Sequence, residues 1–302
     1  MSKIVILHHK DLDGRCAAAV AYRELKTRYN KEDIETIETD YEMSFPEIPM
    51  DTKLLYLLDF SFKAPEFKIL VDTIGRKNVI WIDHHISAYE TLVDFKDLKG
   101  IRTEEWSGTM LTWQYFHPVT TDIVPYVVQL VDDYDRWIMK YGDDTLYFYE
   151  YTNSIDIKNI KGKDWDWLLT RTECELKPII EVGKNIKDVK DNELKRIIKR
   201  LGIPVTIEWE GQRYSAMKIN SSYLFSISQI GHMIYDEMGF DIAWMYYDKA
   251  DDKGNLIRTN NLRSVKVDVS KIAKANGGGG HPSASGWSTL IQPNVYNSVV
   301  KW

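Results

Sequence analysis

The stretch VIWIDHH, residues 79–85, runs from four apolar residues directly into an aspartate and two histidines. Two earlier stretches have the same form: IVILHHKDLDG at residues 4–14 and LLYLLD at residues 54–59. Short apolar runs of this length, separated by helix-like segments, are typical of buried parallel strands. Because ligands bind along the carboxyl ends of strands in an open α/β sheet, we expect carboxylates and imidazoles to gather at one sheet edge. Such a set of side chains suits divalent metal ions.

Strand and helix patterns alternate through the first half of the chain, which predicts an α/β fold with a doubly wound, mostly parallel sheet. The expected strands are residues 3–8, 34–39, 54–59 and 78–83, and the expected helices are residues 14–30, 65–74, 108–116 and 123–134. Residues 145–204 mix tryptophan and leucine with charge, which predicts a helical connector. From residue 205 the pattern predicts a smaller α/β domain, with strands at 205–209, 214–218, 242–247 and 256–262 and a helix at 227–238. We therefore expect three parts: residues 1–144, 145–204 and 205–302.

Composition restricts the classes of protein that the chain can represent. Its 302 residues carry a net charge of −6, which argues against a general nucleic-acid coat because such binding needs clustered lysine and arginine. Two cysteines offer no disulfide framework and favour a reducing compartment. The N-terminal apolar run is too short for a signal peptide, and no run is long enough for a transmembrane helix. A cytoplasmic protein is expected.

The first motif places His9, Asp11 and Asp13 two residues apart, followed by Gly14. Residues with this spacing in an extended segment point the same way, so three ligands can converge. A helix cap with a turn is the simpler interpretation of this motif taken alone. Adjacent histidines favour Mn²⁺, Fe or Co over Mg²⁺.

Two further segments contain clustered polar groups. Residues 131–137, VDDYDRW, put three carboxylates at an expected helix end, where they oppose the helix dipole and a cation would offset the cost. An ion pair of Asp132 or Asp135 with Arg136 is the alternative. Four glycines precede His281 and would let backbone amides approach an anion, unless they form only a flexible turn. Arg263 could bind a phosphate with two hydrogen bonds or be a surface arginine.

Taken together, these motifs closely resemble the DHH phosphoesterase superfamily, in its subfamily with a C-terminal DHHA1 domain. The resemblance covers most of the chain and follows the order of the motifs, from His9 through Asp59 and residues 83–85 to the glycine run before His281. It implies a DHH catalytic domain at residues 1–144 and a DHHA1 substrate-binding domain at residues 205–302. It also implies a hydrolase of phosphate esters that uses two divalent metal ions, usually Mn²⁺.

The resemblance assigns roles to individual residues. One metal ion is expected on His9, Asp11 and Asp59, and the other on Asp13, Asp59, His84 and Asp133. His8 stays an alternative to His9, and Asp132 and Asp135 stay alternatives to Asp133. His85 and Asp83 are the expected catalytic residues. The expected substrate-binding residues are Arg263, Ser264, Gly278, Gly279, Gly280 and His281.

These features predict Mn²⁺-dependent hydrolysis of short oligonucleotides to mononucleotides. Other activities of the same chemistry stay open, namely 3′-phosphoadenosine-5′-phosphate phosphatase and cyclic mono- or dinucleotide phosphodiesterase. A nucleotide-binding module without turnover is the alternative from another class. The expected partner is a short oligonucleotide or nucleotide, without a membrane, and the oligomeric state, a homodimer included, stays open.

Overall fold

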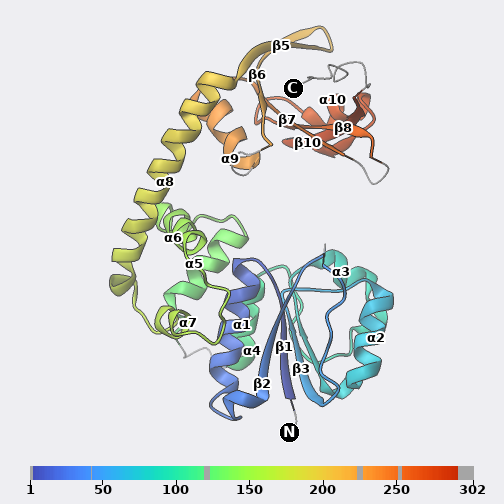
Figure 1. Cartoon of the computed structure of the whole chain (residues 1–302), viewed down its shortest axis with the longest axis vertical. Coiled ribbons are helices and arrows are strands. Elements are labelled where there is room, and N and C mark those ends of the chain that lie inside the picture. The colour runs from blue at the N-terminus through green and yellow to red at the C-terminus, as the bar shows by residue number, and fades with distance from the viewer. Residues whose placement is uncertain (1–2, 42, 119–122, 223–226, 251–253, 292–302) are drawn as a thin grey trace, which may run out of the picture. The chain divides into compact units, whose positions relative to one another are not determined.

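The structure is a computed structural model that describes residues 3–41, 43–118, 123–222, 227–250 and 254–291, apart from the side chains of residues 86 and 87. The chain divides into two compact units, Met1–Lys187 and Asp188–Trp302. Each unit is built on its own β-sheet (Figure 1). None of the helices within the described ranges combines the length and apolar character needed to cross a membrane.

The first unit contains a four-stranded parallel sheet in the order β2-β1-β3-β4. The strands are β1 (Lys3–His9), β2 (Ile34–Thr39), β3 (Thr52–Leu58) and β4 (Val79–Ile82). The helices of its first part are α1 (Leu12–Leu25), α2 (Ala64–Ile74), α3 (Ile86–Thr91), α4 (Gly108–Phe116) and α5 (Tyr126–Asp135), with short 3₁₀ turns at Lys31–Asp33, Arg76–Asn78 and Val93–Phe95. This architecture confirms the predicted α/β fold with a parallel sheet.

Helices cover both faces of this sheet (Figure 1). Ile4 and Ile6 of β1 share one core with α1, α4 and α5, whereas Val5 and Leu7 share the other core with α2. Successive residues of a strand point to opposite faces, so an uninterrupted apolar run is what a sheet covered on both sides requires. The sheet is therefore doubly wound, and its carboxyl edge is the part left for polar side chains.

Three helices follow within or across the expected connector: α6 (Asp143–Ser154), α7 (Lys163–Leu168) and α8 (Glu173–Leu201). Phe148 and Trp165 are buried in the same core as α1, and the Trp165 indole donates a hydrogen bond of 2.8 Å to the Ile157 carbonyl. Residues up to Ile180 contribute to this core. The helices before that point are thus packed parts of the first unit.

The second unit contains a six-stranded mixed sheet in the order β5-β6-β7-β8-β10-β9. Its strands are β5 (Ile203–Trp209), β6 (Gln212–Asn220), β7 (Ile242–Ala250), β8 (Leu256–Arg263), β9 (Gly279–His281) and β10 (Ala284–Leu290), and its helices are α9 (Ile227–His232), a π-helical turn (Met233–Glu237) and α10 (Val269–Ala275). Met217 and Met245 share a core with α9, whereas Ala216 and Leu262 on the opposite face share one with α10. The sequence did not predict β9 and β10, because residues 277–286 lack an alternating apolar pattern.

Candidate metal centre

The first group of ligands lies where β1 turns into α1. His9 Nδ1 is 2.8 Å from Asp11 Oδ2, while Asp11 Oδ1 accepts a 2.9 Å hydrogen bond from the Gly14 amide and caps α1. Asp11 is therefore both the predicted helix cap and a member of the cluster. His8 is buried, with its Nδ1 2.7 Å from the His9 carbonyl oxygen, so the structure places His9 and not His8 in this group.

Asp59 follows β3 in a left-handed backbone conformation, with φ of +55°, which residues other than glycine rarely adopt. Its amide donates a 2.9 Å hydrogen bond to the Ile82 carbonyl, which joins the ends of β3 and β4. A Cβ atom added to Gly108 would lie 2.5 Å from Asp59 Cβ, so glycine leaves the space for this side chain. Backbone strain of this kind persists where the surroundings impose it and is frequent at functional sites.

A second group contains Asp13, His84 and Asp135. His84 Nε2 is 3.9 Å from Asp13 Oδ2 and 3.5 Å from Asp135 Oδ2. The amides of Gly108 and Thr109 donate to the two Asp13 carboxylate oxygens over 2.7 and 2.9 Å. Because these amides start α4, a helix N-terminus stabilises the Asp13 carboxylate at the cluster.

Asp59 links the two groups. Its Oδ2 lies 3.7 Å from His9 Nδ1, and its Oδ1 lies 3.2 Å from His84 Nε2. The ligand atoms within each group, His9-Asp11-Asp59 and Asp13-His84-Asp135, are all within 4.8 Å of one another. One carboxylate thus faces two sets of potential ligands, as the bridging role expected for Asp59 requires.

The unpaired atoms of this cluster fit a cation. Three of its buried atoms have no hydrogen-bond partner among the described residues: His9 Nδ1 and both Asp59 oxygens. The short approach of His9 Nδ1 to Asp11 is therefore not aligned as an N–H···O hydrogen bond. A buried acceptor without a partner costs roughly 1–3 kcal/mol, and a divalent ion with oxygen and imidazole ligands would remove that cost. The residues present therefore suit metal ions.

The pKa values of the cluster also indicate a metal centre. Burial, followed by repulsion from Asp13, raises the pKa of Asp59 well above its usual range. Burial and the Asp13 carboxylate also raise the pKa of Asp135 to about 7. Burial by itself would lower the pKa of His9, but its contacts with Asp11 and Asp59 outweigh burial and raise it to about 10. Without cations, this centre therefore retains protons that metal ions would displace.

Asp83 lies behind the cluster and orients His85. Its Oδ1 is 2.7 Å from His85 Nδ1 and accepts a 2.8 Å hydrogen bond from the His84 amide. Its Oδ2 accepts a 2.5 Å hydrogen bond from Ser61, whose hydroxyl in turn accepts from the Trp81 indole. Asp83 is buried, and both of its carboxylate oxygens accept hydrogen bonds. It is therefore suited to position His85. His85 keeps Nε2 for another partner.

Asp133, the ligand expected from the fourth motif, is not brought to this cluster. Its carboxylate accepts hydrogen bonds from the Lys140 amide at 2.8 Å, the Tyr141 amide at 3.2 Å and the Thr145 hydroxyl at 2.5 Å. Asp132 instead forms a two-point ion pair with Arg136, at 3.1 and 2.8 Å. Of the three carboxylates left open by the sequence, only Asp135 lies beside His84.

Three contributors to the centre were missed in the sequence. Gly108 and Thr109 provide the amides that hold Asp13, and Gly108 also provides the space for Asp59. The preceding Ser107 caps α4, so a serine followed by glycine at a helix start was a usable signal. Asp40 was also missed; its Oδ1 lies 3.5 Å from His9 Nε2.

The expected substrate-binding residues lie in the second unit. Arg263 of β8 and His281 of β9 both pair with Ala284 of β10, so their side chains lie on the same face of the sheet. Gly231 of α9 permits this arrangement, since an added Cβ there would lie 2.9 Å from Arg263 Cβ. Ser264 is buried, and its hydroxyl donates to the Asp241 carbonyl at 2.7 Å.

The glycine run adopts backbone conformations that a side chain would disturb. Gly280 has φ of +136°, and a Cβ on Gly278 would lie 2.1 Å from the Gly286 carbonyl oxygen. A Cβ on Gly279 would meet nothing within 4 Å. Two of the three expected glycines are therefore required by local backbone geometry, whereas Gly279 is open.

Comparison with known proteins identifies the first unit. Residues 3–124 match the DHH family, N-terminal domain. An uncharacterized protein of Acanthamoeba polyphaga mimivirus is 26% identical over 299 residues, which cover 94% of this chain and 66% of that protein. The chain thus spans about two thirds of the length of this curated relative.

Solved structures share the fold across both units. The pGpG-specific phosphodiesterase PggH from Vibrio cholerae has a TM-score of 0.57 at 14% identity, covering 97% of this chain and 95% of that chain. The DHH domain of a protein described as a member of a family of ribosomal proteins also has a TM-score of 0.57, at 15% identity, covering 96% of this chain and 83% of that chain. Residues 3–124 therefore carry a DHH family N-terminal domain, and the chain shares its fold with PggH.

Proposed function

We propose that this protein is a phosphodiesterase that uses two metal ions, most readily Mn²⁺, to hydrolyse short oligonucleotides to mononucleotides. The observation that carries the proposal is the position of Asp59, whose two unpaired oxygens face His9 on one side and His84 on the other. Divalent ions held in such a centre supply Lewis acidity and an activated water for phosphate ester hydrolysis. We assign one metal ion to His9, Asp11 and Asp59, and the other to Asp13, Asp59, His84 and Asp135.

The chain's own residues prepare this centre for a phosphate. Asp83 holds the His85 ring through Nδ1 and raises the pKa of His85. The protonated ring therefore keeps its Nε2–H to donate to a substrate oxygen. The α4 amides hold Asp13 in place, which limits the movement of one ligand during the reaction. We therefore treat His85 as the catalytic residue that contacts substrate and Asp83 as the residue that positions it.

The second unit supports substrate selection. Arg263 and His281 lie on one face of its sheet, separated by one strand, and together can contact one phosphate group. We therefore keep residues 205–302 as the proposed substrate-binding domain and residues 1–144 as the proposed catalytic domain. Of residues 145–204, those up to Ile180 pack in the core of the first unit. In this proposal, the anchored phosphate determines which substrates the second unit selects.

Short linear substrates are favoured over the alternatives by fold and by charge. PggH, which shares the fold, is a pGpG-specific phosphodiesterase, and pGpG is a linear dinucleotide. A net charge of −6 disfavours long strands, whose binding depends on a positively charged groove. Phosphatase activity on 3′-phosphoadenosine-5′-phosphate and cyclic nucleotide hydrolysis use the same centre and are tested beside the main proposal.

The deciding experiment is a substrate panel with Mn²⁺. Labelled RNA and DNA of two to about twenty nucleotides, cyclic dinucleotides and the bisphosphate nucleotide would be incubated with the protein and with an Asp59→Asn variant. We expect the highest kcat/KM on RNA of two to about four nucleotides and no turnover by the variant. Preference for the bisphosphate or a cyclic substrate would select an alternative, and nucleotide binding without Mn²⁺-dependent turnover would indicate a binding module.

A further inference from the structure

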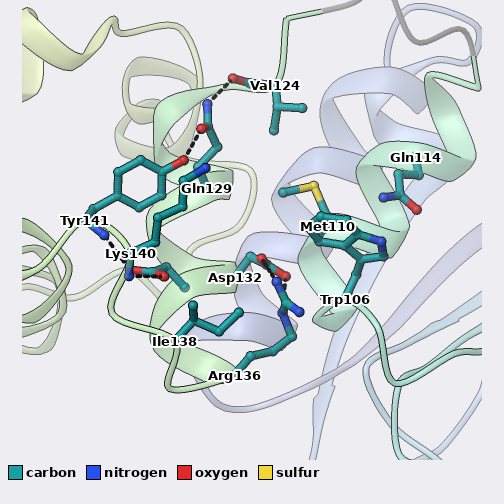
Figure 2. A pocket seen from close by; sticks show the side chains of 11 residues that line it. Trp106, Met110, Gln114, Val124, Gln129, Asp132, Arg136, Ile138, Lys140 and Tyr141 are labelled. Atoms are coloured by element: carbon teal, nitrogen blue, oxygen red, sulfur yellow. Dashed lines mark hydrogen bonds and ion pairs between the residues drawn. The ribbon is translucent and has the colours of Figure 1, made fainter.

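A cavity of about 470 Å³ lies between α4 and the segment that contains α5 and residues 136–141. Figure 2 shows Trp106, Met110 and Gln114 along one wall and Lys140 and Tyr141 along the other. The lining contains no member of the two ligand groups of the candidate metal centre. Its volume lies within the range of about 300–1,000 Å³ that is usual for small-molecule sites.

The floor of the cavity is rigid and nearly neutral. Asp132 pairs with Arg136 through both carboxylate oxygens and also accepts a 2.8 Å hydrogen bond from the Ser107 amide. The Arg136 guanidinium donates to the Glu105 carbonyl at 2.5 Å and packs 4.7 Å from the centre of the Trp106 ring. The charged groups of the floor are therefore paired within the protein. The partly exposed Trp106 ring borders the cavity.

The opposite wall is fixed by Asp133 and stores strain. Trp137 and Met139 have φ values of +54° and +56°, and the Asp133 carboxylate holds the next two amides, those of Lys140 and Tyr141. The Tyr141 hydroxyl donates to Gln129 at 2.5 Å. Left-handed conformations at non-glycine residues are typical of ligand clamps, where the surroundings impose them.

Two polar groups of the lining are left for a ligand. The Lys140 ammonium lies 5.1 Å from the centre of the Tyr141 ring, and among the described residues no carboxylate pairs with it. The Gln114 amide likewise has no hydrogen-bond partner within the described ranges. The cavity therefore offers one free cation, one free amide, and apolar contacts with Met110 and the Trp106 ring.

We infer that this cavity binds one nucleotide unit, with its base on the wall of Trp106 and Met110 and its phosphate at Lys140. The inference rests on the proposed function for the choice of a nucleotide as ligand. The aromatic ring suits a planar base, the free ammonium suits a phosphate, and Gln114 can donate to and accept from a base edge. The nucleotide is either a unit of the oligonucleotide substrate or a released mononucleotide.

The first test measures AMP binding by calorimetry to the full chain in excess chelator, where the metal centre contributes no cation. We expect saturable binding that weakens at least about tenfold in Lys140→Gln and is lost in Gln114→Trp, which fills the cavity. Lys77→Gln, an exposed lysine outside the lining, is the matched control and should bind as wild type does. Melting temperatures verify that each variant is folded. Equal affinity in wild type and Lys140→Gln, or no saturable binding to wild type, would overturn the inference.

A second measurement separates the two sources of the nucleotide. If the cavity holds a unit of the substrate, Lys140→Gln raises KM for a trinucleotide; if it holds released product, the variant relieves inhibition by added AMP. Either result supports the site. The absence of both effects in a folded variant would contradict it. Binding in chelator needs no turnover, so AMP binding without Mn²⁺-dependent hydrolysis would contradict the proposed function alone. Hydrolysis without AMP binding would contradict the cavity alone.

Discussion

At the scale of single residues, the position of one carboxylate along a helix decides whether it reaches the candidate metal centre or supports the fold. Asp132, Asp133 and Asp135 lie within four residues, yet they contact Arg136, a loop and His84, respectively. Successive residues of an α-helix are rotated by about 100° around its axis. A shift of one or two positions in aligning a motif therefore exchanges a ligand for a structural residue.

This difference predicts opposite results for two matched variants. Asp135→Asn should remove a metal ligand, lower kcat/KM at least about 100-fold and reduce the rise in melting temperature that Mn²⁺ produces. Asp133→Asn should keep that rise but destabilise the protein by about 1–3 kcal/mol, because its carboxylate holds two loop amides and Thr145. Thermal melts with and without Mn²⁺ measure both effects. The reverse pattern would return the ligand role to Asp133.

The protonation of the centre predicts how metal removal depends on pH. Asp135 has its pKa raised from 3.8 to about 7 and His9 from 6.5 to about 10, so these two groups bind more protons in the folded, metal-free chain than in the unfolded chain. The stability that they contribute is therefore lost as pH rises from about 4. The carboxyls of Asp11 and Asp83 have lowered pKa values, and their contribution is lost only at lower pH.

Metal binding requires the deprotonated ligands, so Mn²⁺ should raise the melting temperature more at about pH 8 than at about pH 5.5. Differential scanning calorimetry in chelator and in Mn²⁺ at both pH values measures this. The Asp59→Asn variant serves as the control, because it lacks the carboxylate proposed to bridge the metal ions. An equal Mn²⁺ effect at the two pH values would show that proton release from this centre does not accompany binding.

At the scale of elements, the strands that the sequence predicted best are those that an apolar run alone is enough to define. The runs that became β1, β3 and β4 are apolar at every position because helices cover both faces of their sheet, and that pattern is readable without the structure. It also located His9, Asp59 and His84 at strand ends. In contrast, β10 carries few apolar residues, and α3 is a helix of six residues. Hydrogen bonds to neighbouring strands, which a single segment does not reveal, define β9 and β10.

Asp83 is expected to stabilise the turn after β4. Asp83→Ala should lower the free energy of unfolding by about 1–3 kcal/mol, because it leaves Ser61 and the His84 amide without their acceptor. Asp83→Asn keeps an acceptor oxygen and should retain most of the stability. Both variants should lose activity, since neither holds His85 with a carboxylate. Urea unfolding and kcat/KM separate the two effects, and an alanine variant as stable as wild type would show that Asp83 does not hold the turn.

At the scale of the whole molecule, the two units carry different parts of the proposed chemistry. The candidate metal centre and the lined cavity belong to the first unit, while Arg263 and His281 belong to the second. Each unit has its own sheet and its own cores. Under the proposed function, variants in the second unit should therefore alter substrate preference without altering metal binding.

This division predicts that Arg263 matters only for substrates that reach the second unit. Arg263→Ala should reduce kcat/KM on a trinucleotide by the equivalent of about 1.5–3 kcal/mol, the value of a hydrogen bond to a charged group. A small chromogenic phosphodiester, which bears no second phosphate, should be affected much less. Arg258→Ala is the matched control, because Arg258 lies on the same strand but on the opposite face, paired with Asp248.

The comparison separates three roles for Arg263. Equal losses on the trinucleotide and the small diester would mean that Arg263 supports the fold or the metal centre, and a lowered melting temperature would accompany the first of these. No loss on either substrate would make it a surface arginine beside α9. A selective loss on the trinucleotide, absent in Arg258→Ala, requires a contact with the part of the substrate that is not cleaved. Only that outcome fits a substrate anchor at Arg263.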